Sequence, residues 1–178
     1  MIIYHGTDEE SAKNIINSGI DLSLCSEIAD FGQGFYTTID KNFAIKCANR
    51  ASKRTDNNPA LVVIDYCSDS VRGVKYFGKP SVEWLQFIVN NRAYNTDKTY
   101  LDVVGTCKDH NADARHHVVQ GLTADGNIVD FVEYCIINKE KVQEEDISNI
   151  FSKNYPEQIS FHTEKSLKHI KVKSIEFL

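Results

Sequence analysis

Apolar and polar residues follow one another along the chain in a pattern that predicts short strands alternating with helices. An apolar run at residues 1–6 predicts a first strand, and the β-branched and aromatic residues 34–39 predict a second. The segment between them begins with Thr7 and Glu10 at capping-box spacing, which predicts a helix start, and Gly19 can end that helix. The chain therefore opens as strand, helix, loop and strand.

The rest of the chain continues this mixture of elements. Asp40 predicts the start of a helix with Phe43 on its apolar face, and Pro80 with Ser81 predicts the start of another. The order is too irregular for a doubly wound parallel sheet, so we expect an α+β fold in a single domain of residues 1–178. Further strands are expected at 60–66, 100–106, 157–162 and 170–177, and helical segments at 128–138, 143–151 and 163–169, the last with Thr163 as its cap.

Composition indicates an ordinary globular protein. Hydrophobic residues make up 42% and charged residues 25% of the 178 positions, and no apolar run approaches the roughly 18 residues of a membrane span. The first residues lack the basic and long apolar regions of a signal peptide. Five cysteines are scattered without a Cys-x-x-Cys pair, which argues against a disulfide framework and a zinc ribbon. We therefore expect a cytoplasmic location and no contact with membranes.

Charge and histidine content narrow the chemistry further. A net charge of −5 gives no general attraction to nucleic acid. Asp109, His110, His116 and His117 are candidate metal ligands, but they match no known ligand spacing, and adjacent histidines usually point apart. We expect this segment to be a solvated loop, and we expect no metal site.

Residues 30–38, DFGQGFYTT, contain two familiar motifs that fail on context. Asp30-Phe31-Gly32 matches the magnesium-binding triplet of protein kinases, but only 29 residues precede it, without a glycine-rich loop or a catalytic loop. Gly32 and Gly34 match the start of a dinucleotide fingerprint, but a strand-like segment follows where that motif needs a helix. The stretch is better interpreted as a loop that leads into a strand.

Two other short motifs carry a resemblance to a known superfamily. His5-Gly6-Thr7 and Gly34-Phe35-Tyr36 resemble the first two motifs of the ADP-ribosyltransferases, which place a histidine, a tyrosine and a third polar residue on three strands. Gln158, at the head of QISFH, takes the third place. More narrowly, the chain resembles the bacterial DUF3990 group, on five segments in order that cover nearly the whole chain: YHGT, DFGQGFYTT, EWLQFIVNNR, DVVGT and QISFHTEKSL.

The resemblance implies a fold and a reaction. The fold would be ADP-ribosyltransferase-like, with small split mixed or antiparallel sheets flanked by helices. The reaction would be NAD-dependent transfer of ADP-ribose to a protein or nucleic-acid acceptor, with release of nicotinamide through an oxocarbenium-like transition state. His5, Tyr36 and Gln158 would be the catalytic residues. The imidazole of His5 would bind a ribose hydroxyl, the ring of Tyr36 would stack on nicotinamide, and Gln158 would bind the ribose 2′-hydroxyl.

The same resemblance implies further contacts to NAD. Gly6 would let the backbone approach the carboxamide closely, and Thr7 would support the same turn. Gly34 would keep the pocket open beside Tyr36. Phe43 would either form a second wall of the nicotinamide pocket or belong to the core.

The third position departs from the superfamily, where a glutamate is usual. Gln158 keeps the hydrogen bonding but lacks the charge that stabilises developing positive charge. Glu157 is adjacent, and a shift of one residue would turn it inward instead, because strand side chains alternate between faces. The helix after Tyr36 also lacks the second tyrosine of the poly-forming members. Transfer of a single ADP-ribose is therefore favoured over polymer synthesis.

Two functions of different classes follow. The first is a mono-ADP-ribosyltransferase acting on an unknown macromolecular acceptor, as a toxin or effector with a cognate antitoxin or regulator. The second is a non-catalytic NAD- or ADP-ribose-binding module, which the neutral Gln158 favours. A related branch that removes a 2′-phosphate from RNA would need a basic groove, and the acidic chain disfavours it.

Overall fold

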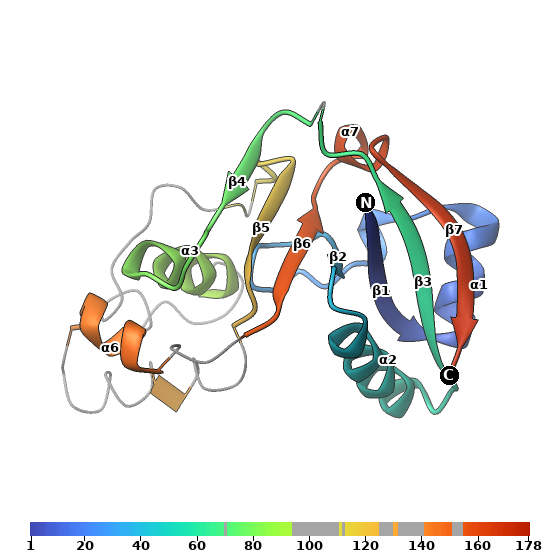
Figure 1. The fold of residues 1–178 in the computed structure, drawn as a ribbon, viewed down its shortest axis with the longest axis horizontal. Coiled ribbons are helices and arrows are strands. Elements are labelled where there is room, and N and C mark those ends of the chain that lie inside the picture. The colour runs from blue at the N-terminus through green and yellow to red at the C-terminus, as the bar shows by residue number, and fades with distance from the viewer. Residues whose placement is uncertain (70, 94–110, 112, 125–129, 132–140, 151–154) are drawn as a thin grey trace.

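Seven strands form one mixed sheet in the order β4-β5-β6-β2-β1-β3-β7 (Figure 1). The computed structural model describes residues 1–178 except 70, 94–110, 112, 125–129, 132–140 and 151–154. All strand pairs are antiparallel apart from β4 with β5, which is parallel. The strands are β1 (Ile2–Asp8), β2 (Phe35–Thr38), β3 (Pro59–Tyr66), β4 (Val74–Tyr76), β5 (Val118–Leu122), β6 (Glu157–Phe161) and β7 (Ile170–Phe177).

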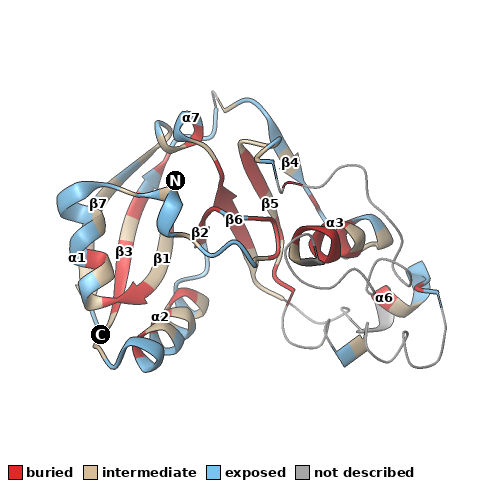
Figure 2. Ribbon diagram, turned by 180° about the vertical axis from the view of Figure 1, so that it is seen from behind, coloured by how far each residue is buried: buried red, intermediate tan, exposed pale blue. Residues whose placement is uncertain are grey.

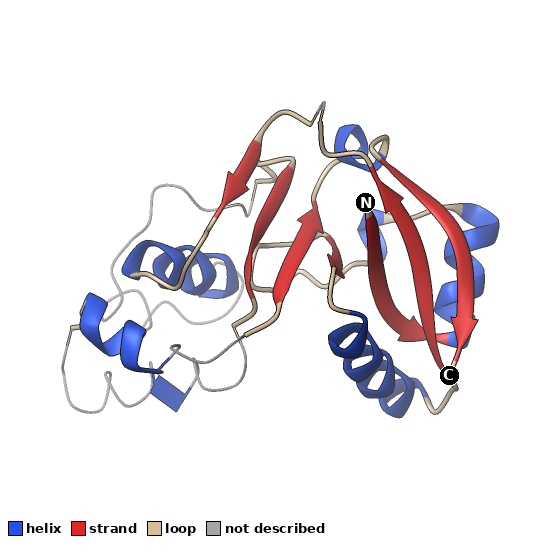
Figure 3. Ribbon diagram, in the orientation of Figure 1, coloured by secondary structure: helices blue, strands red, loops and turns tan. Residues whose placement is uncertain are grey.

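Helices cover this sheet unevenly (Figure 3). The described helices are α1 (Glu9–Ser18), α2 (Lys41–Thr55), α3 (Val82–Ala93), α6 (Glu144–Ile150) and α7 (Glu164–Leu167), with a short 3₁₀ turn η1 (Leu22–Leu24). α1 and α2 lie at the β1-β3-β7 end, whereas α3 and α6 lie at the β4-β5 end (Figure 1). Within the described ranges, no helix combines the length and apolar character that a membrane span requires.

The shortest ladder between neighbouring strands lies at the centre of the sheet, between β1 and β2. Their ladder contains a single residue pair, Tyr4 with Thr38, whereas β1 pairs with β3 over its whole length from Ile2 to Asp8. We predicted small split sheets, and the structure instead has one continuous sheet. Among the described residues, the pair of Tyr4 with Thr38 is the only ladder pair between a β1-β3-β7 half and a β2-β6-β5-β4 half.

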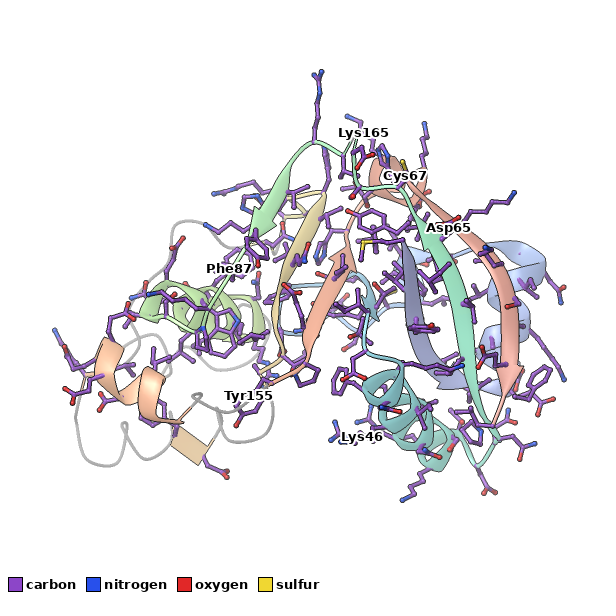
Figure 4. The ribbon with its side chains drawn as sticks, in the orientation of Figure 1. Lys46, Asp65, Cys67, Phe87, Tyr155 and Lys165 are labelled. Carbon is purple, nitrogen blue, oxygen red and sulfur yellow. The ribbon has the colours of Figure 1, made fainter. Side chains whose placement is uncertain are left out.

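Three apolar clusters of described residues pack against the sheet: two large ones and a small one between α2 and β3, made of Ala44, Ala48 and Leu61 (Figure 2). The first joins Ala12 of α1 to inward side chains such as Ile3 and Val62, and its members also include Phe35 and Phe161. The second gathers around Phe31 and the apolar face of α3, whose labelled residue Phe87 is fully buried (Figure 4). The apolar side chains of α3 therefore hold the loop before β2 against the β2-β6-β5-β4 half of the sheet. The members of this second cluster are Phe31, Phe77, Trp84, Leu85, Phe87, Ile88, Val89, Val119, Ala124, Val142 and Ile147.

The residues that cap the helices can be compared with those predicted from the sequence. Asp40 caps α2 through the amides of Asn42 and Phe43, and Thr163 caps α7, as predicted. The predicted capping box of Thr7 and Glu10 is wrong. Strand β1 runs on through Asp8, and the Asp8 carboxylate accepts from the Ser11 amide as the N-cap of α1. A carboxylate near the N-terminus of a helix also interacts favourably with the helix dipole.

Most predicted strands are present, and two others were missed. Strands β1, β2, β3, β6 and β7 match predicted segments. β4 was missed because it spans only Val74–Tyr76, and β5 because it directly follows a polar, irregular stretch. The predicted strand 100–106 lies outside the described residues, as does most of the predicted helix 128–138.

Candidate functional site

His5 lies on β1 at the point where the sheet narrows. Its Nδ1 is 2.7 Å from the backbone oxygen of Tyr36 on β2, and its ring lies 4.4 Å from that of Phe35, tilted by 32°. A carbonyl oxygen can only accept, so Nδ1 carries the proton and Nε2 keeps its lone pair. Burial lowers the pKa of His5, although the bond to Tyr36 and the charge of Asp8 oppose this. His5 is therefore a neutral imidazole that offers an acceptor at Nε2.

Two hydrogen bonds hold the hydroxyl of Tyr36. Its phenolic oxygen donates to the Gly32 carbonyl at 2.7 Å and accepts from the Phe31 amide at 2.8 Å. Burial, followed by the charge of Asp30, raises its pKa well above the ordinary tyrosine value. The hydroxyl stays protonated at neutral pH, so Tyr36 is a fixed aromatic surface rather than a base. Its ring packs against those of Phe31 and His162, at 6.4 and 6.2 Å between centroids.

Gln158 lies on β6, on the same face of the sheet as Tyr36. The register pairs Thr38 with Gln158 and Tyr36 with Ser160, so these four side chains share one face. Gln158 is 8% exposed, and its Nε2 donates to Oδ2 of Asp30 at 2.9 Å. Glu157 points to the other side of β6 and is half-buried. The inward residue at the start of this strand is therefore the amide and not the carboxylate.

Asp30 joins the loop, α3 and β6 into one buried cluster. One carboxylate oxygen accepts from Arg92 in an ion pair, and the other accepts from the Ala124 amide at 2.9 Å as well as from Gln158. The side chain of Asp30 is only 11% exposed. A carboxylate at this depth is stable only with such partners, because burial of an unpaired charge is costly.

Buried amides hold the same loop from the side of α3. Asn91 donates to the carbonyls of Asp30 and Phe87, and its Oδ1 accepts from the Asn111 amide at 2.7 Å. Asn111 donates in turn to the Phe31 carbonyl at 3.2 Å. The loop backbone at 30–32 is therefore fixed by side chains far away in sequence, and its conformation does not depend on local turn propensity alone.

The glycines of the predicted motifs have packing reasons in this structure. A Cβ on Gly6 would overlap the backbone of α2 at Ala44 and Ala48, so Gly6 lets α2 lie directly on β1. A Cβ on Gly34 would come within 2.6 Å of His162 Nδ1. Both glycines thus allow close packing of protein against protein, whatever their relation to a ligand.

Two other predicted binding residues lie outside the cluster around Asp30. Thr7 is buried on β1, where it pairs with Ala60. Phe43 is half-buried in the first turn of α2, and among the described residues no ring contact links it to Tyr36.

His162 is a buried residue of this region that the sequence did not single out. Its Nδ1 bonds the Gln33 carbonyl at 2.7 Å and its Nε2 bonds Ser160 Oγ at 2.8 Å, with 5% of the residue exposed. Burial lowers its pKa to about 4, the bond to Gln33 opposes this, and His116 adds to it. His162 is thus a neutral side chain that links Ser160 of β6 to the loop backbone at Gln33.

One pocket lined by described residues reaches the edge of this region. This pocket, of about 190 Å³, is lined by Leu22, Ser23, Gln33, Asn111, Asp113, Ala114 and His162. Two others, of about 470 and 300 Å³, lie around His169 near α7. None of these three includes His5, Tyr36 or Gln158. Across the described part of the chain, no group of three metal-ligating side chains occurs, and Asp109 and His110 lie outside it.

The structure thus brings the three predicted catalytic residues onto three neighbouring strands, β1, β2 and β6. It joins Tyr36 and Gln158 on one face, while His5 approaches β2 from the side of Phe35. A ligand touching all three must therefore span the β1-β2 junction. Sequence reasoning missed Asp30 as a partner of Gln158, since 128 positions separate the two. A signal for the ion pair did exist, because Arg92 follows directly after an apolar helical stripe.

These features define a single α+β chain with a polar, buried loop at the centre of a mixed sheet. The family described as "Protein of unknown function (DUF3990)" matches residues 1–172, and the chain belongs to this family. No curated protein and no solved structure matches the chain.

Proposed function

We propose that the protein is an NAD-dependent mono-ADP-ribosyltransferase. In this reaction the bond between the nicotinamide nitrogen and C1′ of its ribose breaks, and nicotinamide leaves as a neutral molecule with the bonding electron pair. A lone pair of the acceptor forms the new bond to C1′, and the acceptor gives its proton to solvent. The protein must orient the ribose, hold the departing ring and face the positive charge that develops on the sugar.

The observation that carries the proposal is that His5 and Gln158 each keep an acceptor atom after their hydrogen bonds to the protein are made. His5 donates from Nδ1, which leaves Nε2 as an acceptor. Gln158 donates from Nε2, which leaves Oε1 as an acceptor. Ribose hydroxyls are donors as well as acceptors, so two acceptors on the strands flanking β2 suit recognition of a ribose.

Tyr36 supports the same proposal through rigidity. Two hydrogen bonds fix its phenol, and its raised pKa keeps it neutral. A ring fixed before the ligand arrives loses little entropy on binding, and an aromatic face attracts a cationic ring such as oxidised nicotinamide. Departure of nicotinamide requires no general acid, which agrees with a site whose tyrosine and histidine are both neutral.

Labelled NAD tests this function directly. The intact protein is incubated with cell lysate and NAD labelled in its adenylate phosphate, and label in acid-insoluble material is measured together with released nicotinamide. We expect transfer by the wild-type protein and loss of transfer in Tyr36→Ala, with Tyr36→Phe retaining part of it because the ring remains. Tyr76→Ala is the matched control, since Tyr76 is an exposed tyrosine on β4. The absence of both transfer and nicotinamide release from the wild-type protein would contradict the proposal.

A non-catalytic NAD- or ADP-ribose-binding module is the second candidate. The specific observation in its favour is that Gln158 is neutral and that Asp30, the carboxylate to which it donates, is already paired with Arg92. A module of this kind would be stabilised by NAD, by about 2.7 kcal/mol at a ligand concentration of 100 Kd. It would, however, release no nicotinamide. Thermal unfolding with NAD, followed by the release assay, therefore separates the two functions.

A further inference from the structure

We propose that Asp30 is the positioning residue of the site: its carboxylate turns Gln158 so that Oε1 faces the ribose, and it supplies the negative charge that Gln158 lacks. This inference rests on the proposed function and deepens it. The superfamily pattern places one glutamate at the third position, whereas this chain distributes the same two properties, an acceptor and a negative charge, over a hydrogen-bonded pair.

The orientation of Gln158 follows from the chemistry of its partner. An ionised carboxylate has no proton to donate, so the atom of Gln158 that lies 2.9 Å from Asp30 Oδ2 must be the NH₂ group. Without Asp30, the amide could rotate by half a turn and exchange its oxygen and nitrogen at little steric cost. Asp30 removes that freedom, and its charge makes the bond stronger than one between neutral groups.

The ionised state of Asp30 is supported by its other partners. Arg92 pairs with Oδ1, and the Ala124 amide donates to Oδ2. The three donors come from α3, from the segment after β5 and from β6, so Asp30 is fixed from three directions. Arg92 pairs with Oδ1, whereas the oxygen that faces Gln158 is Oδ2.

The same geometry explains why a glutamine stands at this position. A glutamate at 158 would place a second carboxylate at hydrogen-bond distance from Asp30, where the two would repel each other unless they shared a proton. A carboxylate at position 30 therefore favours an amide at position 158, and a carboxylate at position 158 would favour an amide at position 30. One member of the pair carries the charge, and the other provides the donor.

Exchange of the two groups tests this coupling. We expect Asp30→Asn and Gln158→Glu each to lower the rate of nicotinamide release by roughly tenfold or more, the scale seen when a supporting hydrogen bond is removed. The double variant Asp30→Asn with Gln158→Glu has one amide and one carboxylate again. It should release nicotinamide at least several-fold faster than either single variant. Asp113→Asn is the matched control, because Asp113 is an exposed aspartate that pairs with Arg115, and its rate should equal that of the wild-type protein.

The outcomes separate this inference from the proposed function. If the wild-type protein neither binds NAD nor releases nicotinamide, the proposed function fails and the inference fails with it. If the wild-type protein is active and the double variant is no better than the worse single variant, the inference alone is overturned. Thermal unfolding of the wild-type protein, the two single variants and the double variant guards against misfolding: Gln158→Glu should be the least stable at neutral pH, and the double variant should recover part of that loss. A purely structural role would restore stability without restoring the rate, and that result also overturns the inference.

Discussion

The two halves of the sheet are stabilised by different means. In the β1-β3-β7 half, apolar side chains and Gly6 allow α1 and α2 to pack directly on the strands. In the β2-β6-β5-β4 half, an apolar cluster is also present, but the loop at 30–34 is fixed by buried polar groups: Asp30, Asn91, Asn111, Gln158 and His162. We call the β1-β3-β7 half the packed half, because packing mainly stabilises it. We call the β2-β6-β5-β4 half the polar half, because packing and buried hydrogen bonds stabilise it together.

The difference shows where chemistry can reside. Buried polar groups contribute little net stability, and each one costs stability when a partner is lost. A fold that only needed a core would fill these positions with apolar residues. The polar cluster lies beside Tyr36 and next to the junction with β1, which is where the proposed site lies. Substitutions in the two halves should therefore have different effects on stability.

The largest effect is expected in the packed half, at Gly6. Gly6→Ala places a methyl group against the backbone of α2 at Ala44, which cannot move aside as a side chain can. We expect a loss of about 3 kcal/mol or more in the free energy of unfolding, measured with denaturant. The control is Gly19→Ala, where no atom lies within 4 Å and only the positive φ of 87° is unfavourable. That change should cost roughly 1–2 kcal/mol. Equal losses for the two variants would contradict the packing account.

In the polar half, His162 should make stability depend on pH. Its pKa is about 4 in the folded protein, below the ordinary value of 6.5. Between these values the unfolded chain binds more protons, so stability falls as pH falls, by up to about 3 kcal/mol across the window. Unfolding of His162→Gln should show a weaker dependence between pH 6.5 and 4. His5, whose pKa is also lowered, would supply the slope that remains. An unchanged slope in His162→Gln would show that His162 is not the group responsible.

An intermediate effect is expected at the ion pair between Arg92 and Asp30. Arg92→Met leaves the Asp30 carboxylate largely buried with one partner fewer. Loss of one partner of a buried pair typically costs 3–5 kcal/mol, and the partial exposure of Arg92 reduces this to about 2 kcal/mol. The matched change is Arg115→Met, whose pair with Asp113 is exposed and should contribute less than about 1 kcal/mol. If both variants unfold at the same denaturant concentration, the polar cluster is not structurally important.

The smallest effect is expected at the surface of the packed half. Lys41 and Glu176 form an ion pair at 2.6 Å, with both side chains about two-fifths exposed. Glu176→Gln should leave the unfolding free energy almost unchanged, because an exposed pair is screened by water and even more so by high salt. A change as large as that of Arg92→Met would remove the contrast between buried and exposed charges.

The sequence predicted the local features of both halves well. Alternation and β-branched residues identify β1, β2, β3, β6 and β7, because strand faces leave a period of two in the chain. Asp40 and Thr163 were identified as caps because a cap is a local interaction. Thr7 was misassigned because Asp8, one position later, is an equally suitable cap.

The polar cluster could not be predicted in the same way. Asp30 meets Arg92 across 62 positions and Gln158 across 128, and no local pattern records such pairings. His162 follows a strand-like run, and its burial depends on Gly34, which makes room for its ring. His5, Tyr36 and Gln158 were chosen by resemblance, and their hydrogen-bond orientations required the fold.

The central claim is that NAD binds where β1, β2 and β6 lie side by side, at His5, Tyr36 and Gln158. Titration calorimetry of the intact protein with NAD tests this claim most directly. We predict saturable binding that Gln158→Ala weakens by about tenfold, the equivalent of one hydrogen bond of about 1.4 kcal/mol. Glu176→Gln, in the packed half, should bind NAD as the wild-type protein does. No binding at millimolar NAD, or equal affinity in the Gln158→Ala variant, would contradict the account.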